Sequence, residues 1–217
     1  MKHFRKSLNL LLILLVLDLA FIVLSLIDTL SNLNFGNFLV QLDGGFAEKY
    51  QYLKFIGVSL ISIILWIKRR SIQYLIFTII PLYLFWDDSK QIHERAGTKF
   101  ASLIYKGNAN DTLISNFRFQ DIGEILFMSL IAFAFLIIFL ICFRLSNNFE
   151  RLFMKKIFYL LIIFGIFAIA IDSIHQLFSG KIYDLVSIIE DGGEMIPISV
   201  ISTYFLKNLF FRKELNF

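Results

Sequence analysis

Six stretches of the chain are apolar over about 20 residues each, which is the length that an α-helix needs to cross the hydrocarbon core of a bilayer. Hydrophobic residues make up 58% of the sequence, and its mean hydropathy is +0.73; both values are high for a soluble domain of this size. The sequence therefore predicts an all-α, polytopic membrane protein with six transmembrane helices. The six stretches are 8–28, 51–67, 72–88, 123–143, 157–178 and 185–206.

The charged residues orient these helices. The loops and ends on one side of the bundle hold 13 of the 21 Lys and Arg residues, but only Glu150 and Glu214 among the 17 acidic residues. Basic loops mark the cytoplasmic side of a polytopic protein. We therefore expect both termini to be cytoplasmic, in a cell inner membrane. The four segments are 1–7, 68–71, 144–156 and 207–217.

The same arrangement predicts a single transmembrane domain over residues 1–217, built from three hairpins at about 1–70, 71–150 and 151–217. The lipid bilayer is then the first partner of the chain. Topology accounts for the basic residues, and the sequence contains no nucleic-acid-binding motif, so we expect no nucleic-acid partner. Cys142 is the only cysteine, which excludes an internal disulfide.

Most acidic residues fall in the helices or toward the opposite, extracytoplasmic side, and a first cluster ends the third apolar stretch. Asp87 and Asp88 are followed there by His93 and Glu94. If the helix continues to Ala96, His93 points about 120° away from Asp87 and needs partners from other helices. The alternative is an ordinary solvated helix end with ion pairs between neighbouring turns.

A second cluster lies near the outer end of the fifth apolar stretch. Asp172, His175 and Gln176 are spaced by three and four residues, so they share one stripe of a helix. Asp172 lies roughly 22 Å along this helix from Ile157, at or within the edge of the hydrocarbon. A carboxylate at that depth is costly and marks a functional site. The alternative is an Asp–His hydrogen bond that only joins helices.

A third cluster lies in the sixth apolar stretch, where Glu190, Asp191 and Glu194 surround two glycines. Pro197 follows, and its ring clashes with the carbonyl group of Gly193 in a regular helix. We therefore expect this helix to be interrupted, with free backbone groups beside a polar cavity. The alternative assigns Asp191 and Glu194 to a capping box at the start of a helix.

Two further polar features lie in the first hairpin. Asp18 lies about 15 Å into the first helix, near the bilayer midplane, and it has no charged neighbour in its own helix. It serves either packing or a proton relay. In residues 43–54, Glu48 shares a helix face with Gln51, and Lys54 either extends toward the headgroups or pairs with an acid.

Three short patterns resemble those of small bacterial multipass membrane proteins without an assigned activity. They are Asp-Gly-Gly-x-x-Glu-x-x-Gln-Tyr-x-Lys at 43–54, Asp-Asp-x-x-x-x-His-Glu at 87–94 and Glu-Asp-Gly-Gly-Glu-Met at 190–195. A weaker similarity is to ceramidase-like membrane hydrolases, which hold zinc with several His and an Asp between helices. This chain has only two outer-side His and six predicted helices rather than seven, so zinc hydrolysis is not carried over.

The clusters support a divalent-cation site as the first functional hypothesis. Two imidazoles and several carboxylates suit zinc, iron or manganese. With catalysis, the site would hydrolyse a lipid-like substrate, with His93, Glu94 and Asp172 as the catalytic groups. The candidate metal ligands are Asp87, Asp88, His93, Asp172, His175, Glu190 and Glu194.

Two alternatives remain open at this point. In one, the chain is a non-enzymatic partner of another membrane protein, an accessory subunit whose acids only fix the helix geometry. In the other, it is a transporter or channel for protons or cations, with Asp18 at the midplane. Against transport, the cytoplasmic half of the predicted helices shows no polar stripe to continue the path.

Overall fold

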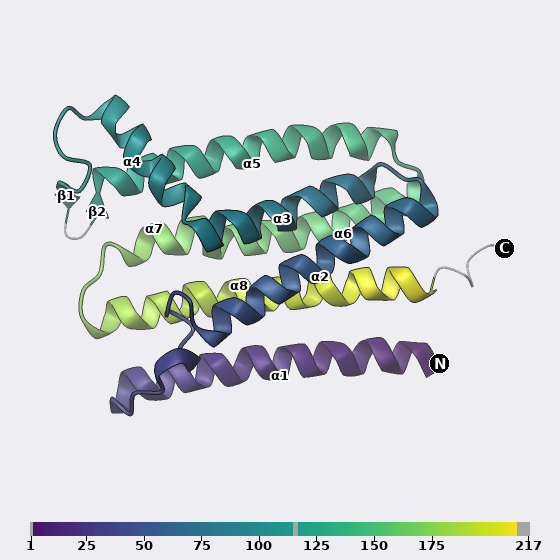
Figure 1. Cartoon of the computed structure of the whole chain (residues 1–217), viewed down its shortest axis with the longest axis horizontal. Helices are drawn as coiled ribbons and strands as arrows, with labels where there is room; N and C mark the ends of the chain where they lie inside the picture. The colour runs from purple at the N-terminus through teal and green to yellow at the C-terminus, as the bar shows by residue number, and fades with distance from the viewer. Residues whose placement is uncertain (1, 115–116, 212–217) are drawn as a thin grey trace.

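Long helices lie side by side along the molecule in the computed structural model (Figure 1). The structure describes residues 2–114 and 117–211, with side chains for 8–114 and 117–210, so several basic residues of the two ends lie outside the described side chains. The elements are α1 Lys2–Ser31, α2 Phe46–Arg69, α3 Gln73–Lys90, α4 Ile92–Ile104, β1 Thr112–Ile114, β2 Phe117–Arg118, α5 Phe119–Leu145, α6 Asn148–Gly165, a π-helical segment Ile166–Ile171, α7 Asp172–His175 and α8 Lys181–Phe211.

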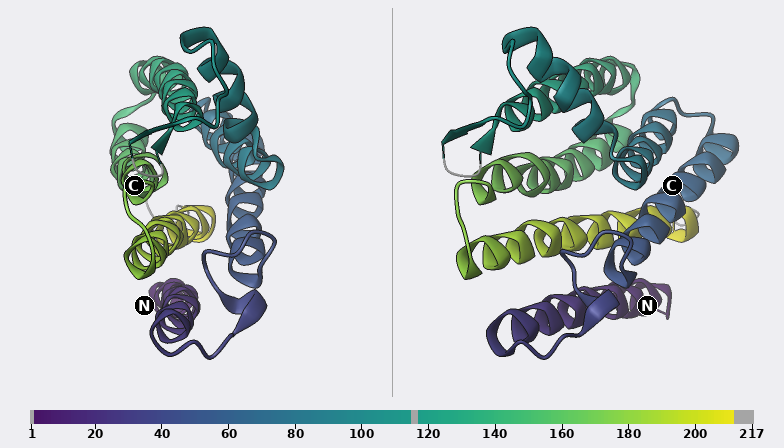
Figure 2. Two further views of the ribbon diagram at one scale, coloured as in Figure 1. Left: turned by 90° about the vertical axis from the view of Figure 1, so that its left-hand side faces the viewer. Right: turned by 60° about the vertical axis from the view of Figure 1, so that its left-hand side comes forward.

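The fold is all-α apart from one short element. The strands β1 and β2 pair as a small antiparallel hairpin between α4 and α5, which the sequence did not predict. It lies with α4 at one end of the bundle, and both termini lie at the opposite end (Figures 1 and 2). We call these the hairpin end and the termini end.

Within the part of the chain that the structure describes, four helical spans are long and apolar enough to cross a membrane. The helices α3 and α8 occupy the other two stretches predicted to span, but they carry more charge. Asp87, Asp88 and Lys90 end α3, and α8 contains three acids near its middle. The four spans are Leu8–Ser31, Phe46–Arg69, Phe119–Leu145 and Asn148–His175.

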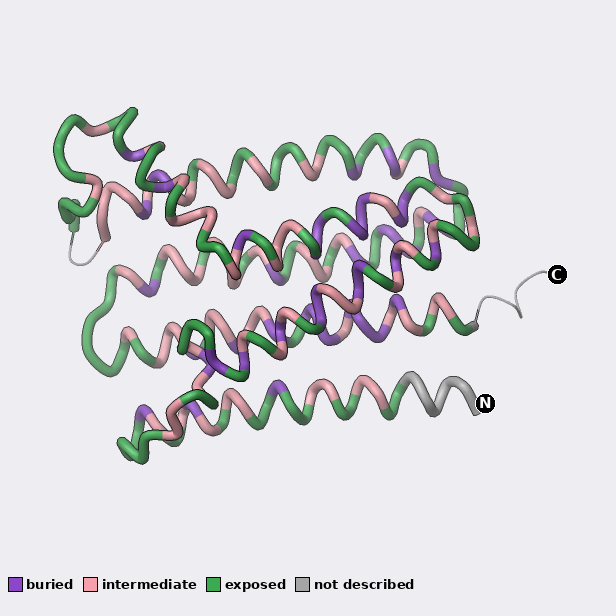
Figure 3. The backbone as a smooth tube through the Cα atoms, viewed as in Figure 1, coloured by how far each residue is buried: buried purple, intermediate pink, exposed green. Residues whose placement is uncertain are grey.

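The best-buried side chains belong to the central helices. Tyr74, Phe77 and Phe205 are almost fully buried and pack edge-to-face or tilted with Phe153. The helices α1 and α5 instead expose many large apolar residues and are mostly green or pink in Figure 3. Such faces are costly in water and suit lipid contact, because hydrocarbon tails are as apolar as Leu.

The third helix does not continue to Ala96, so this prediction was wrong. Gln91 adopts a left-handed conformation with φ 49° and ψ 47°, which ends α3 at Lys90 and starts α4 in a new direction. The reason lies in packing: α4 lies against the start of α5, where the carbonyl group of Gly97 approaches Gly123 so closely that neither position has room for a Cβ atom.

The predicted interruption of the last helix is also absent. The helix α8 is continuous, with Pro197 inside it. Its two glycines serve close packing, because a Cβ atom at Gly192 would meet Ile22 of α1 and one at Gly193 would meet Phe167. The irregularity lies in the preceding helix instead, as the π-helical segment Ile166–Ile171.

Candidate metal centre

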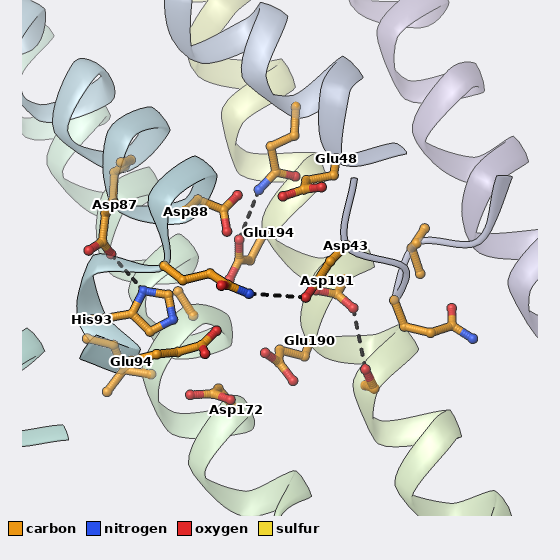
Figure 4. A pocket seen from close by; sticks show the side chains of 18 of the residues that line it. Asp43, Glu48, Asp87, Asp88, His93, Glu94, Asp172, Glu190, Asp191 and Glu194 are labelled. Carbon is orange, nitrogen blue, oxygen red and sulfur yellow. Dashed lines mark hydrogen bonds and ion pairs between the residues drawn. The ribbon is translucent and has the colours of Figure 1, made fainter. Parts of the chain in front are cut away.

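A cavity of about 730 Å³ lies toward the hairpin end of the bundle. Its walls come from α2, α3, α4, α5, α7 and α8, from the end of α6 and the π-helical segment, and from the loop before α2 (Figure 4). Among the described residues that line it there is no Lys or Arg. Ten carboxylate residues line it: Asp43, Glu48, Asp87, Asp88, Glu94, Glu124, Asp172, Glu190, Asp191 and Glu194.

Three side chains of this cavity converge with the donor types of a metal centre. Asp172 and His175 come from α7 and Glu190 from α8, and one ligand atom of each lies within 4.8 Å of the others. His175 Nδ1 lies 2.6 Å from Glu190 Oε2 and 3.6 Å from Asp172 Oδ1. Two carboxylates and one imidazole form a donor set that zinc, iron and manganese all accept.

The buried atoms of this trio have no hydrogen-bond partner. His175 is only 6% exposed, and although its Nδ1 lies close to Glu190 Oε2, the contact lacks hydrogen-bond geometry. Neither atom finds another partner among the described residues. A buried polar atom without a partner is costly, so the geometry leaves room for a cation to supply the missing interaction.

The neighbours of His175 suit a ligand role. Its Nε2 lies 3.0 Å from the side-chain amide of Gln176, and its ring packs edge-on against Tyr183 at 4.7 Å. An amide can present its oxygen or its nitrogen. With the oxygen toward the ring, Nε2–H donates and the lone pair of Nδ1 remains free for a metal, as in many metal-bound histidines.

The local fold explains how these residues meet. Asp172 and His175 share the stripe that their spacing predicted, and α7 follows directly on the π-helical segment. Gly180 then adopts φ 61°, which turns the chain into α8. Because α8 runs back along α7 without a break, Glu190 comes to lie beside His175. Glu190 was predicted as a ligand from an interrupted helix, and the regular helix places it there instead.

The direction of α4 brings a second group to the opposite wall. His93 Nδ1 lies 3.0 Å from Asp87 Oδ2, and Tyr83 donates to the other oxygen of Asp87 at 3.3 Å. Burial lowers the pKa of His93, but the hydrogen bond and charge of Asp87, with Glu124 and Glu94, outweigh it and raise that pKa to about 9. His93 is therefore cationic at neutral pH.

The prediction that His93 needs partners from other helices assumed a helix that continues to Ala96. The left-handed turn at Gln91 instead starts α4, so that His93 meets Asp87 of α3, only six residues earlier in the sequence. A metal at His93 would have to displace the proton that this contact favours. Of the predicted ligands, the structure thus brings Asp172, His175 and Glu190 together and pairs His93 with Asp87.

Several of the remaining acids of the cavity have neutral partners. Gln51 donates to Glu194 at 2.9 Å, and Ser187 donates to Asp191 at 3.4 Å. Tyr52 donates to Glu48. Asp88 and Glu194, both predicted as metal ligands, line the cavity outside the trio (Figure 4). Asp191 and Glu194 lie well inside α8, so the capping-box interpretation does not hold for them.

One cavity residue lacked a usable signal in the sequence. Glu124 lines the cavity, but it lies three residues after Asp121, and this spacing is that of an ordinary helix cap. In the structure Asp121 does take the capping role, accepting from the backbone N–H of Arg118 at 2.6 Å. The adjacent Gly123, which allows α4 to approach, is the feature that marks this end of α5 as a packing site.

A separate buried ion pair lies below the cavity, between α1, α2 and α8. Lys54 Nζ lies 2.9 Å from Asp18 Oδ1 and also donates to the carbonyl group of Met195 and to Ser199. Ser199 in turn donates to the second oxygen of Asp18 at 2.6 Å. Both charged side chains are almost completely buried, so Lys54 is the partner that Asp18 lacked in its own helix.

Fold and site together define an all-α bundle of the membrane-spanning type that encloses an acidic cavity with a candidate metal centre. The chain belongs to the family described as a domain of unknown function (DUF8692), which matches residues 50–208. No curated protein and no solved structure gives a significant match. The matched range contains the whole candidate trio.

Proposed function

We propose that this protein binds a divalent cation in the membrane through Asp172, His175 and Glu190. The observation that carries the proposal is the convergence of three ligand atoms within 4.8 Å, two of which are buried and unpartnered. Three protein ligands facing a cavity leave coordination positions open, which is typical of catalytic rather than structural zinc sites. Zinc, iron and manganese all fit the donor set.

We further propose that the site hydrolyses an ester or amide bond of a lipid-like substrate. A divalent metal polarises a carbonyl group and lowers the pKa of a bound water. Glu94 and His93 lie on the wall opposite Glu190 and face the same space (Figure 4). In this proposal Glu94 accepts the proton of the attacking water, and His93, cationic at neutral pH, supplies a proton to the leaving group.

The proposed orientation is six transmembrane helices in one domain, with both termini in the cytoplasm and the cavity on the extracytoplasmic side of the inner membrane. Basic residues at the termini end support it, among them Lys68 and Arg69 in the last turn of α2 and Arg70 directly after it. An impermeant thiol reagent should label Asn108→Cys in intact cells and Ser71→Cys only after permeabilisation, in a Cys142→Ser background. The reverse pattern would exclude this orientation.

The first prediction concerns metal content. Protein purified gently in mild detergent should contain near-stoichiometric divalent metal, measured by elemental analysis. His175→Asn and Glu190→Gln should each lower metal affinity by at least about tenfold, because even a partner that only orients a ligand is commonly worth that much. The same variants should lose any hydrolytic activity.

Matched controls come from the opposite wall of the cavity. His93→Asn and Glu94→Gln make the same chemical changes outside the trio and should retain the metal. Intact wild-type protein that stays metal-free after incubation with zinc, iron and manganese would refute the proposal. Equal metal loss in the control variants would show that cavity charge, rather than this trio, holds the ion.

A second candidate function is movement of protons or cations through the bundle. The sequence suggested no polar stripe in the cytoplasmic half, but the structure buries one between α2, α3 and α8. Within the described residues, Ser62 Oγ and both amide atoms of Gln73 are buried without a partner, and such groups bind water. The buried polar residues below the cavity are Asp18, Lys54, Ser59, Ser62, Gln73, Thr78, Ser199, Ser202 and Thr203.

A flux assay separates this candidate from hydrolysis. Proteoliposomes with a trapped pH dye should dissipate a proton gradient faster than empty vesicles, and Asp18→Asn should remove the difference. Flux equal to that of empty vesicles would exclude the candidate.

A further inference from the structure

A second cavity, of about 430 Å³, lies between α3, α5, α6 and the π-helical segment. Its lining consists of aliphatic and aromatic side chains such as Ile80, Met128, Phe135 and Phe158, with Tyr83 as its one hydroxyl group. None of the described lining residues carries a charge. We call this space the apolar groove.

The apolar groove adjoins the acidic cavity. Five residues line both spaces, so the two are separated by single side chains rather than by a helix. One of these residues, Met128, has a flexible side chain that adapts to different neighbours. Together the spaces have the form of an amphiphile, polar at the hairpin end and apolar along the bundle. The shared residues are Leu84, Met128, Phe164, Ala168 and Ile169.

We propose that the apolar groove holds the hydrocarbon chain of a long-chain amine whose cationic head lies in the acidic cavity. The inference rests on the proposed function, because it names the class of amphiphile whose head group would enter the same cavity. It also stands on two observations of its own, the continuity of the two spaces and the charge of the larger one.

The charge of the cavity selects the head group. Ten carboxylates line it, and no described Lys or Arg does. An ammonium group gains attraction from the ionised carboxylates of such a wall and hydrogen-bond acceptors from its carboxyl oxygens, whereas a phosphate or carboxylate head finds only His93 as a cationic side chain among the described lining residues. Anionic lipids are therefore poor ligands, and an amine with hydrogen-bonding groups nearby is the favoured chemistry.

The apolar groove determines where the hydrocarbon chain of the ligand lies, but it contributes little to the binding affinity. A hydrocarbon chain that leaves the bilayer for an apolar groove gains little hydrophobic free energy, because both surroundings are equally apolar. Selectivity must then follow the head group. Two amphiphiles with the same chain and opposite head charge should differ strongly in binding.

A glycine that lines the apolar groove can be replaced by a large side chain that fills it. Gly165 lines it, has helical backbone angles, and a Cβ atom there would meet nothing within 4 Å. Gly165→Phe should therefore fill the groove without a backbone clash. Gly57→Phe is the matched control, because Gly57 of α2 has the same open space but lines neither cavity. Ala132→Phe fills the groove from exposed α5 if Gly165→Phe fails to fold.

The experiment uses the full-length protein in nanodiscs with a long-chain primary amine that carries a diazirine at its chain end. Photolysis should label residues of α3, α5 and α6 that line the groove. An unlabelled amine should compete, and a fatty acid of the same chain length should not. Gly165→Phe and Ala132→Phe should reduce labelling to background, while Gly57→Phe labels as the wild type does.

Three outcomes would overturn the inference: labelling that persists in both groove variants, labelling spread evenly over all lipid-facing helices, or equal competition by the fatty acid. A stable dimer whose contact covers the groove and prevents labelling would also overturn it. Metal content is measured on the same samples. Labelled but metal-free wild-type protein would refute the proposed metal function and leave the groove assignment standing.

Discussion

At the scale of single residues, the Lys54–Asp18 pair shows most clearly how the fold decides between alternatives. The sequence did not identify a partner for Asp18 or a role for Lys54, and the structure pairs the two. Both side chains are buried, and Ser199 and the carbonyl group of Met195 satisfy their remaining hydrogen-bonding capacity. Buried ion pairs of this kind are costly to break from one side, because the remaining charge has no partner.

We therefore expect Lys54→Met and Asp18→Asn to destabilise the protein unequally. Lys54→Met leaves a buried carboxylate unpaired and should cost about 3–5 kcal/mol of unfolding free energy. Asp18→Asn keeps a hydrogen-bond acceptor and should cost less. Lys54→Met combined with Asp18→Leu should be milder than the sum of the single changes, as measured by unfolding in mixed micelles. Strict additivity would show that the two charges do not interact.

His93 gives a pH-dependent contribution at the same scale. Because its pKa is raised from 6.5 to about 9, its stabilising contact with Asp87 is complete below about pH 6.5 and is lost as the pH rises through 9. The melting temperature of the wild type should exceed that of His93→Gln at about pH 6, where His93 is protonated and Asp87 is ionised, and the difference should vanish by about pH 10. A constant difference would contradict the assignment.

Residue-level prediction succeeded where helix spacing alone decides. Asp172 and His175 lie on the same face of a helix because residues three apart do so. In the structure this face points toward Glu190. Lys54 and Asp18 are 36 residues apart, and no local rule links them. Which helices are neighbours decides such a pair, and a single sequence does not contain that information in readable form.

At the scale of elements, the turn at Gln91 and the contact of α4 with α5 shape the cavity. Without the turn, His93 and Glu94 would continue past the membrane on α3. Gly97 and Gly123 then hold α4 against α5, and a Cβ atom on Gly123 would lie only 2.1 Å from the carbonyl oxygen of Gly97. The sequence showed both glycines, but it suggested a helix end for Gly97 rather than a helix crossing.

Gly123→Ala should therefore displace α4. The clash involves backbone atoms, so the helices must move apart, at a cost of about 1–3 kcal/mol. His93 should lose its contact with Asp87, which the loss of the pH-dependent melting difference would report. Gly165→Ala is the control, because its Cβ atom meets nothing within 4 Å, and Ala usually stabilises a helix relative to Gly. Similar destabilisation by both would argue against the packing explanation.

At the scale of the whole molecule, hydropathy predicted the bundle well because burial in lipid requires long uniform apolar runs. It predicted α3 and α8 less clearly, since these helices carry the acids of the cavity. The sequence predicted that most acidic residues lie in the helices or toward the extracytoplasmic side. In the structure, ten of them line the acidic cavity. The partners of these acids could not be predicted, because eight helical segments and the loop before α2 supply the walls of the cavity.

The π-helical segment before Asp172 has a consequence for how such a centre arises or disappears. Segments of this kind are rare and occur mostly as local bulges inside α-helices, often at functional sites. In a regular α-helix, one residue more or fewer rotates the chain beyond it by about 100°, so the winding of Ile166–Ile171 sets the direction in which Asp172 and His175 point. A change in this short segment can therefore alter the centre without replacing any of its ligands.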